Sequence, residues 1–196
     1  MITQRFNPTD KWSPFHFNYE FMGFIEMLSE LSSLLSENLL NGSNMIEIGS
    51  YMGESTKLFG CTKLFNKIYS IDPHTGQEKF NEIANITWGE VIKEYQLNTK
   101  LFNNIEHIKD FSYNVVDKFE DNSIDFIYVD GAHDYESVKR DLKLYLPKLK
   151  NGGIIGGHDY NPKHWPDVCK AVTEVVGNPY KVFRDTSWIY VKKNLI

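Results

Sequence analysis

The sequence predicts an α/β protein with a doubly wound, mostly parallel sheet, helices on both faces and an antiparallel last strand. Two observations predict this fold. Short apolar runs of strand length alternate with segments whose apolar residues recur at helical spacing, which is typical of parallel α/β sheets. Residues 180–184 and 187–192 then indicate two strands joined by a short turn, which adds an antiparallel strand.

The amino-terminal part is expected to be an arm followed by one helix. Residues 1–17 are polar and aromatic with two prolines, so we expect a cap or arm there. The residues after it place apolar side chains at helical spacing, and Asn41-Gly42 is a helix stop signal. The apolar positions of this helix are Phe21, Phe24, Ile25, Leu28, Leu31 and Leu35.

The remaining elements alternate along the chain, and their residues predict the following ranges. Strands are expected over 45–48, 67–71, 105–108, 124–129 and 154–157, the last of them after a turn at 151–153. Helices are expected around 58–64, 77–95, 113–119, 135–145 and 168–176, and Asp141 is assigned to a solvated helix face. Neither repeats nor linkers interrupt the pattern. We therefore expect one domain over 1–196, with an arm and helix over 1–43 and a core over 44–193.

The composition is that of an ordinary globular domain. The 196 residues carry a net charge of -5, with 41% hydrophobic and 24% charged residues. The negative charge argues against nucleic acid as a partner, because phosphate binding needs a basic surface. Two cysteines make no disulfide framework, and Cys61 falls in an apolar helical pattern that favours the core. Neither a signal peptide nor a membrane span is evident, so we expect a cytoplasmic protein without a membrane partner.

Four polar side chains, which we call the polar rim, follow two of the expected strands. Asp130 and His133 come just after one strand, and His158 and Asp159 come just after the next. Because the carboxyl ends of parallel strands meet at one edge of a sheet, these groups should lie close together. A single histidine is as well explained by capping or core packing. Four such groups at two strand ends favour a functional site.

A glycine turn over residues 49–53, the glycine loop, follows the first core strand. Gly49 and Gly53 let a ligand approach the backbone, and the helix that follows offers free N–H groups. The spacing lacks the middle glycine of the dinucleotide fingerprint. The carboxylate of Glu47 before the turn suits a cationic or amine-bearing ligand better than a pyrophosphate. A tight turn without a ligand is the alternative interpretation.

Asp72 ends the second core strand, 23 residues after Gly49. An acidic residue at about this distance is well placed to bind the hydroxyls of a ribose. The alternative is that Asp72 only caps the turn before Pro73. The glycine loop and Asp72 together predict a nucleoside site without a strong phosphate site.

At this point the sequence resembles the class I S-adenosylmethionine-dependent methyltransferases, and in particular the small-molecule O-methyltransferases of the methyltransferase domain 24 type. The resemblance rests on the glycine loop, on Ile71-Asp72 and above all on residues 125–160. It covers about residues 45–193. It implies a Rossmann-like sheet of seven strands, S-adenosylmethionine as cofactor and a small-molecule acceptor, and it is compatible with a homodimer.

The resemblance also implies roles for individual residues in binding the cofactor. Asp72 would hold the ribose hydroxyls, the segment 110–112 would lie near the adenine, and Asp130 would close the site beneath the sulfonium. The residues expected to bind the cofactor are Glu47, Gly49, Ser50, Tyr51, Gly53, Ser55, Asp72, Asp110, Phe111, Ser112 and Asp130.

The polar rim resembles catalytic elements of the same family. The run from Asp130 to His133 is similar to the D-G-x-H element of metal-dependent sugar O-methyltransferases, in which the Asp binds a divalent cation and the His can act as a base. His158-Asp159 stands where catechol-type relatives carry an Asp-Asn metal pair. An imidazole in that place favours softer metals such as Zn²⁺ or Mn²⁺ over Mg²⁺.

Two mechanisms remain open for the expected catalytic residues Asp130, His133 and His158. In the first, Asp130, His158 and Asp159 bind Mg²⁺, Mn²⁺ or Zn²⁺, which lowers the pKa of a substrate hydroxyl, and His133 removes the proton. In the second, no metal takes part, and His133 or His158 acts as the base. A metal-dependent hydrolase or lyase that uses the polar rim, and a non-catalytic cofactor-binding protein, are the alternative functions.

Overall fold

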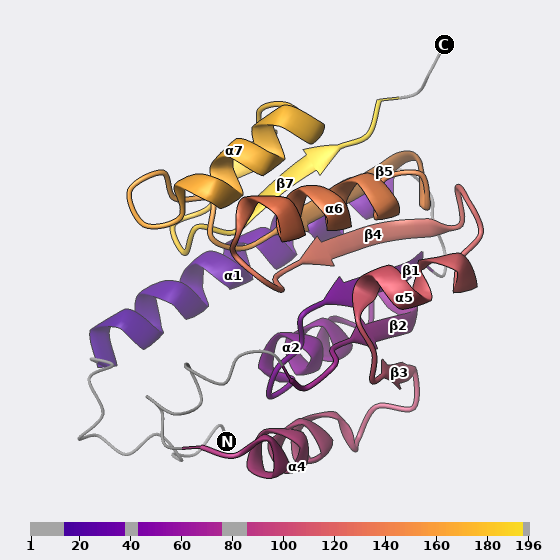
Figure 1. The fold of residues 1–196 in the computed structure, drawn as a ribbon, viewed down its shortest axis with the longest axis vertical. Coiled ribbons are helices and arrows are strands. Elements are labelled where there is room, and N and C mark those ends of the chain that lie inside the picture. Colours follow the sequence, from indigo (N-terminus) through magenta and orange to yellow (C-terminus); the bar gives the residue numbers. More distant parts are fainter. Residues whose placement is uncertain (1–13, 38–42, 76–85, 194–196) are drawn as a thin grey trace.

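The computed structural model describes residues 14–37, 43–75 and 86–193 (Figure 1). Their strands form one seven-stranded sheet in the order β3-β2-β1-β4-β5-β7-β6. The strands are β1 Ser43–Ile48, β2 Phe65–Ile71, β3 Ile105–Ile108, β4 Ile124–Val129, β5 Leu149–Gly157, β6 Lys181–Val182 and β7 Trp188–Val191. The helices are α1 Pro14–Glu37, α2 Glu54–Thr62, α4 Trp88–Thr99, α5 Ser112–Val115, α6 Tyr135–Tyr145 and α7 Pro166–Val175, with the 3₁₀ turn η1 Val116–Lys118.

The directions of the strands confirm the predicted fold class. β1 pairs in parallel with β2 and β4, and the pairs β2–β3 and β4–β5 are parallel as well. β7 lies between β5 and β6 and is antiparallel to both. The order of the strands reverses between β1 and β4, and ligands of such sheets bind at the carboxyl ends of the strands beside this reversal.

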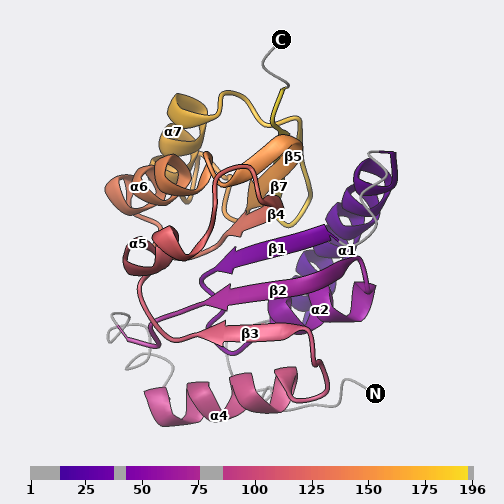
Figure 2. The same ribbon diagram turned by 90° about the vertical axis from the view of Figure 1, so that its right-hand side faces the viewer.

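Helices cover both faces of the sheet, as Figure 2 shows. α5, α6 and α7 cover one face, where their buried side chains join those of the strands in one apolar cluster. α1 and α2 cover the other face, where Met27, Leu31 and Phe59 pack on Phe126 and Tyr128. All six residues of β4 are buried, as expected for a central parallel strand with helices on both sides. Within the described ranges, no helix is long and apolar enough to span a membrane.

Some expected element boundaries were wrong or lie outside the described residues. α1 already begins at Pro14, inside the expected arm, because a proline is tolerated in the first turn of a helix. β5 begins at Leu149, so the expected turn at 151–153 is an irregularity within the strand, which lets Phe126 pair with Ile154. The helix stop at Asn41-Gly42 and most of the first half of the helix expected over 77–95 fall outside the described residues.

Two expected core positions are exposed. Cys61 lies on the exposed side of α2, and Ile25 is exposed on α1. Both residues satisfy helical spacing, but each lies at the margin of the apolar stripe of its helix. The buried stripe of α2 consists instead of Thr56, Phe59 and Gly60.

Candidate active site

The glycine loop joins β1 to α2 at the carboxyl end of the sheet. Gly49 has a φ of 85° and Gly53 a φ of 75°, in the left-handed region that favours glycine. A Cβ atom on Gly49 would lie 2.1 Å from the carbonyl oxygen of Asp130, and one on Gly53 would lie 2.8 Å from the ring of Tyr95. The backbone conformation and the available space therefore both require glycine at these two positions.

Asp72 binds the glycine loop with its carboxylate. Its Oδ2 accepts hydrogen bonds from the amides of Ser50 and Tyr51 at 2.9 and 2.7 Å. Its Oδ1 accepts one from the amide of His74 at 2.7 Å. A carboxylate has about four acceptor positions, so about one remains for a ligand hydroxyl. Asp72 thus lies where the sequence predicts it and braces the loop, while its contact with a ribose stays a prediction.

Glu47 is fully buried behind the glycine loop. Its carboxylate accepts hydrogen bonds from the hydroxyl of Ser55, at 2.5 Å, and from the hydroxyl of Thr56. These two hydrogen bonds connect β1 to α2. Burial raises the pKa of Glu47 to about 7, since the two hydrogen bonds only partly offset it and the charges of Asp130 and Asp72 raise it further. Glu47 and Ser55 therefore support the loop from the inside.

The glycine loop fits a ligand that brings its own polar groups. The hydroxyl of Ser50 is buried and has no hydrogen-bond partner among the described residues. A buried polar group without a partner costs about 1–3 kcal/mol, which a bound ligand can recover. The buried, unpartnered hydroxyl of Ser50 therefore leaves a hydrogen bond that a bound ligand could supply.

The segment after β3 divides into an exposed part and a buried part. Asp110 accepts hydrogen bonds from the amide of Phe111 and the side chain of Asn114, and the ring of Phe111 is exposed. Ser112 is buried, and its hydroxyl donates to Asp141 at 2.6 Å. Asp141 is therefore buried, which corrects the expectation of a solvated position. The reason is that α5 packs on α6 and supplies the donor.

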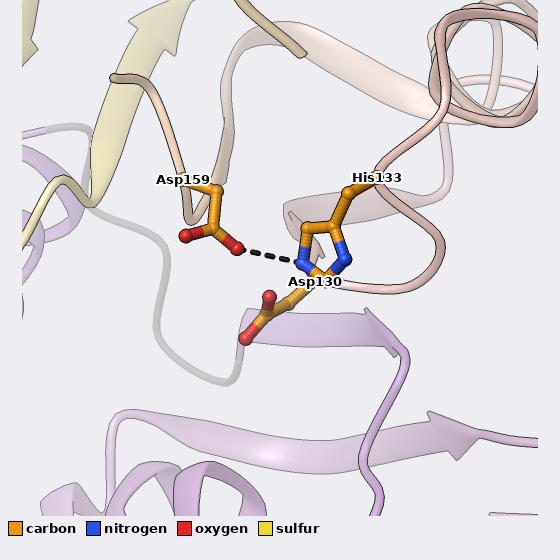
Figure 3. Close-up of side chains that lie close together, drawn as sticks. All are labelled: Asp130, His133 and Asp159. Carbon is orange, nitrogen blue, oxygen red and sulfur yellow. Dashed lines mark ion pairs between the residues drawn. The ribbon is translucent and has the colours of Figure 1, made fainter. Parts of the chain in front are cut away.

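The polar rim assembles at the ends of β4 and β5, and Figure 3 shows three of its side chains, Asp130, His133 and Asp159, close together. The Nε2 atom of His133 lies 2.6 Å from Oδ2 of Asp159, and Nδ1 of His158 lies 3.3 Å from Oδ1 of the same residue. One ligand atom each of Asp130, His133 and Asp159 lies within 4.8 Å of the others. Among the described residues this is the group that could hold a metal ion. This group contains His133 where the expected set of Asp130, His158 and Asp159 contains His158, and the expected set stays a prediction.

The charges of the polar rim stabilise one another. Burial would raise the pKa of Asp159, but the hydrogen bonds from His133 and His158 hold it well below its usual range. Burial opposes a charge on His158, but Asp159 and the surrounding aspartates raise its pKa to about 9. The pKa of His133 is raised for the same reasons. Burial raises the pKa of Asp130, although His158 partly offsets this effect.

Residues 46–160 match the model of a protein family described as a methyltransferase domain. The chain belongs to this family. The predicted membership of the class I S-adenosylmethionine-dependent methyltransferases, with their Rossmann-like fold, is thereby confirmed.

One sequence relative and two solved structures show what else the chain is similar to. Uncharacterized protein R132 of Acanthamoeba polyphaga mimivirus is 33% identical over 155 residues, which cover 69% of this chain but only 63% of that protein. A candidate caffeoyl-CoA O-methyltransferase from Staphylococcus aureus has a TM-score of 0.59 at 17% identity and covers 94% of this chain and 95% of its own. CalS11, a TDP-rhamnose 3'-O-methyltransferase of calicheamicin biosynthesis, has a TM-score of 0.55 at 16% identity. The match covers 87% of this chain and 79% of CalS11.

Two further residues, both beyond the segment that matches the family model, lie at the polar rim. The indole of Trp165 stacks on the imidazole of His133 at 4.4 Å between ring centroids. Buried Asp185 lies between β6 and β7, and its Oδ2 is 3.9 Å from Nε2 of His158. The sequence indicated only a hairpin turn at Asp185. No local pattern predicts its place, because the pairing of β7 with β5 brings it to the rim.

Proposed function

We propose that the protein transfers a methyl group from S-adenosylmethionine to a hydroxyl of a small molecule. The observation that carries the proposal is the contact between the glycine loop and the polar rim, where Gly49 lies against the backbone of Asp130. A methyl donor held by the loop would therefore lie next to the ion pair of His133 and Asp159. Bound S-adenosylmethionine supplies the methyl group, and the residues of the protein align the acceptor and remove its proton.

His133 is the proposed general base. Its Nε2 is engaged by Asp159, so the neutral ring carries its proton on Nε2. The other ring nitrogen, Nδ1, is then the one that takes the proton of the acceptor hydroxyl. Asp159 orients the ring and stabilises its charged form. This arrangement is that of a carboxylate and histidine pair in general base catalysis.

A divalent ion fits the same group of residues. Two carboxylates from Asp130 and Asp159 and the imidazole of His133 form a mixed oxygen and nitrogen donor set, which suits Mn²⁺ or Zn²⁺. Such an ion lowers the pKa of a bound hydroxyl. His133 would then be one of the residues that hold the ion, so metal assistance and direct base catalysis would use this histidine in different roles.

The proposed acceptor is a small hydroxylated metabolite or sugar. The names of the two structural neighbours support this class, because one acts on TDP-rhamnose and the other is a candidate enzyme for caffeoyl-CoA. We also propose that the protein forms a homodimer. We propose neither nucleic acid nor a membrane as its partner.

Calorimetric titration of the metal-stripped protein with S-adenosylmethionine, repeated with Mg²⁺, Mn²⁺ and Zn²⁺, tests the proposal. Binding with a dissociation constant in the micromolar range, about -8 kcal/mol, is the expected result. Metal binding without any affinity for S-adenosylmethionine or S-adenosylhomocysteine would contradict it. That outcome would favour the metal-dependent hydrolase or lyase.

Substitutions at the two halves of the site should have separate effects. Asp72→Ala removes the acceptor of three backbone amides and should weaken S-adenosylhomocysteine binding about tenfold or more, at about 1.4 kcal/mol per factor of ten. His133→Ala should leave this affinity within about twofold but weaken Zn²⁺ or Mn²⁺ binding. Calorimetry measures both affinities, and Asp117→Ala, an exposed acidic residue of η1, is the control. Equal losses of cofactor affinity in both variants would show that the two sites are not separate.

A further inference from the structure

His74 contacts both the glycine loop and the residue that braces it. Its side chain is almost fully buried, with 3% exposed, and its Nε2 lies 2.9 Å from the carbonyl oxygen of Tyr51. A carbonyl only accepts, so Nε2 carries the proton and donates it. The backbone amide of His74 donates to Oδ1 of Asp72 at 2.7 Å. His74 therefore closes a small hydrogen-bonded ring with Asp72 and the loop.

The two residues that this hydrogen bond joins both have a left-handed backbone. Tyr51 has a φ of 42° and His74 a φ of 50°, although neither is a glycine. Such a conformation is strained for a residue other than glycine and persists only where the surroundings hold it. Among the contacts that hold it are the hydrogen bonds to Asp72 and the hydrogen bond between His74 and Tyr51. Backbone strain of this kind concentrates at ligand-binding sites.

Aromatic packing fixes the imidazole of His74 from the side of α4 and β3. Its ring centroid lies 5.5 Å from that of Tyr95 and 4.9 Å from that of His107. Tyr95 also lies against Gly53 at the other end of the glycine loop. The packing therefore limits the rotation of the imidazole and keeps Nε2 directed at the loop.

We propose that His74 is a positioning residue of the cofactor site, which holds the glycine loop in its binding shape through the Tyr51 carbonyl. The inference rests on the proposed function, because it takes the glycine loop as the place where S-adenosylmethionine binds. His74 acts through the loop and not by touching the cofactor. Without its hydrogen bond, the loop loses a contact that opposes the strain at Tyr51. Ligand binding must then order the loop, and the affinity falls.

The test is calorimetric titration with S-adenosylhomocysteine as the probe, in the wild type and three variants. Loss of one net hydrogen bond lowers the affinity about five- to tenfold. This is the effect expected for His74→Leu. His74→Gln places an amide donor near the position of Nε2 and should restore the affinity to within about twofold. Leu and Gln are both unbranched at Cβ, so the backbone strain at position 74 is matched between them.

The third variant separates the hydrogen bond from folding. His74→Asn relieves strain, because asparagine tolerates the left-handed conformation, but its amide is too short to reach the Tyr51 carbonyl. It should therefore fold at least as well as His74→Leu and still bind S-adenosylhomocysteine weakly. Hydrogen exchange at the amides of Ser50 and Tyr51 should be faster in the Leu and Asn variants than in the wild type, with β1 and β4 unchanged.

The outcomes distinguish the inference from the proposed function. If the Leu and Asn variants bind the probe like the wild type, His74 does not position the loop. If the Gln variant binds as weakly as the Leu variant, the donor at Nε2 is not the reason for the loss. If the wild type binds neither S-adenosylmethionine nor S-adenosylhomocysteine, the proposed function itself is wrong.

Discussion

Gly49→Ala should destabilise the protein by about 4 kcal/mol or more, at the high end of the range for single substitutions. The added Cβ would lie 2.1 Å from the carbonyl oxygen and 2.5 Å from the carbonyl carbon of Asp130. These are backbone atoms at the end of the central strand β4, so they cannot move away as a side chain would. The positive φ of 85° adds about 1–2 kcal/mol of strain. Urea unfolding followed by circular dichroism measures the difference.

Gly177→Ala is the matched control for this substitution. Gly177 has a similar φ of 92°, but nothing lies within 4 Å of the position that its Cβ would take. It should therefore cost only the strain of a left-handed alanine, about 1–2 kcal/mol. Equal losses for the two variants would mean that backbone strain alone, and not contact with Asp130, requires glycine in the loop.

Glu47→Gln should stabilise the protein at high pH relative to the wild type. Because burial raises the pKa of Glu47 from its ordinary value of 4.5 to about 7 in the folded state, the folded protein disfavours the charged form. The wild type therefore loses stability as the pH rises from about 4.5 through 7, by about 3 kcal/mol in total. Glutamine never ionises and still offers one acceptor to the hydroxyls of Ser55 and Thr56.

The measurement is the free energy of unfolding of both proteins at pH 5 and pH 8. The difference between variant and wild type should grow by about 2–3 kcal/mol over this interval, while other titrations are common to both proteins and cancel. Glu120→Gln, an exposed residue, should show almost no such change. A constant difference between Glu47→Gln and the wild type would mean that Glu47 is already charged in the fold at pH 5.

A costly buried carboxylate is understandable beside a cofactor loop. Glu47 lies behind the loop in the part of the sheet where the carboxylates of Asp72 and Asp130 also gather. Three carboxyl groups at one strand edge disfavour one another's charged forms, and they favour a cationic ligand, such as the sulfonium and amine of S-adenosylmethionine. The residues that favour ligand binding would then lower the stability of the fold, as is common at functional sites.

Much of the candidate site was predictable because it lies at strand ends. The apolar run 124–129 indicated a buried strand, and Asp130 had to follow it at the carboxyl edge of the sheet. The same reasoning located His158 and Asp159 after β5, and the strand-to-helix turn located Gly49 and Gly53. These predictions depend on local periodicity and turn chemistry, which the order of residues determines directly.

The contacts within the site depended on the tertiary structure. The sequence predicted His158 beside Asp130 and Asp159 in the metal set, whereas the structure brings Nε2 of His133 to 2.6 Å from Asp159, whose backbone is left-handed with a φ of 63°. The burial of Asp141 depends on a donor 29 residues away, and the place of Asp185 depends on the pairing of β7 with β5. The sequence by itself determined the elements, the fold class and the strand ends that carry polar groups. Only the tertiary structure decided which of those groups meet. The residues in contact lie far apart in the sequence, so no local pattern of apolar and polar residues connects them.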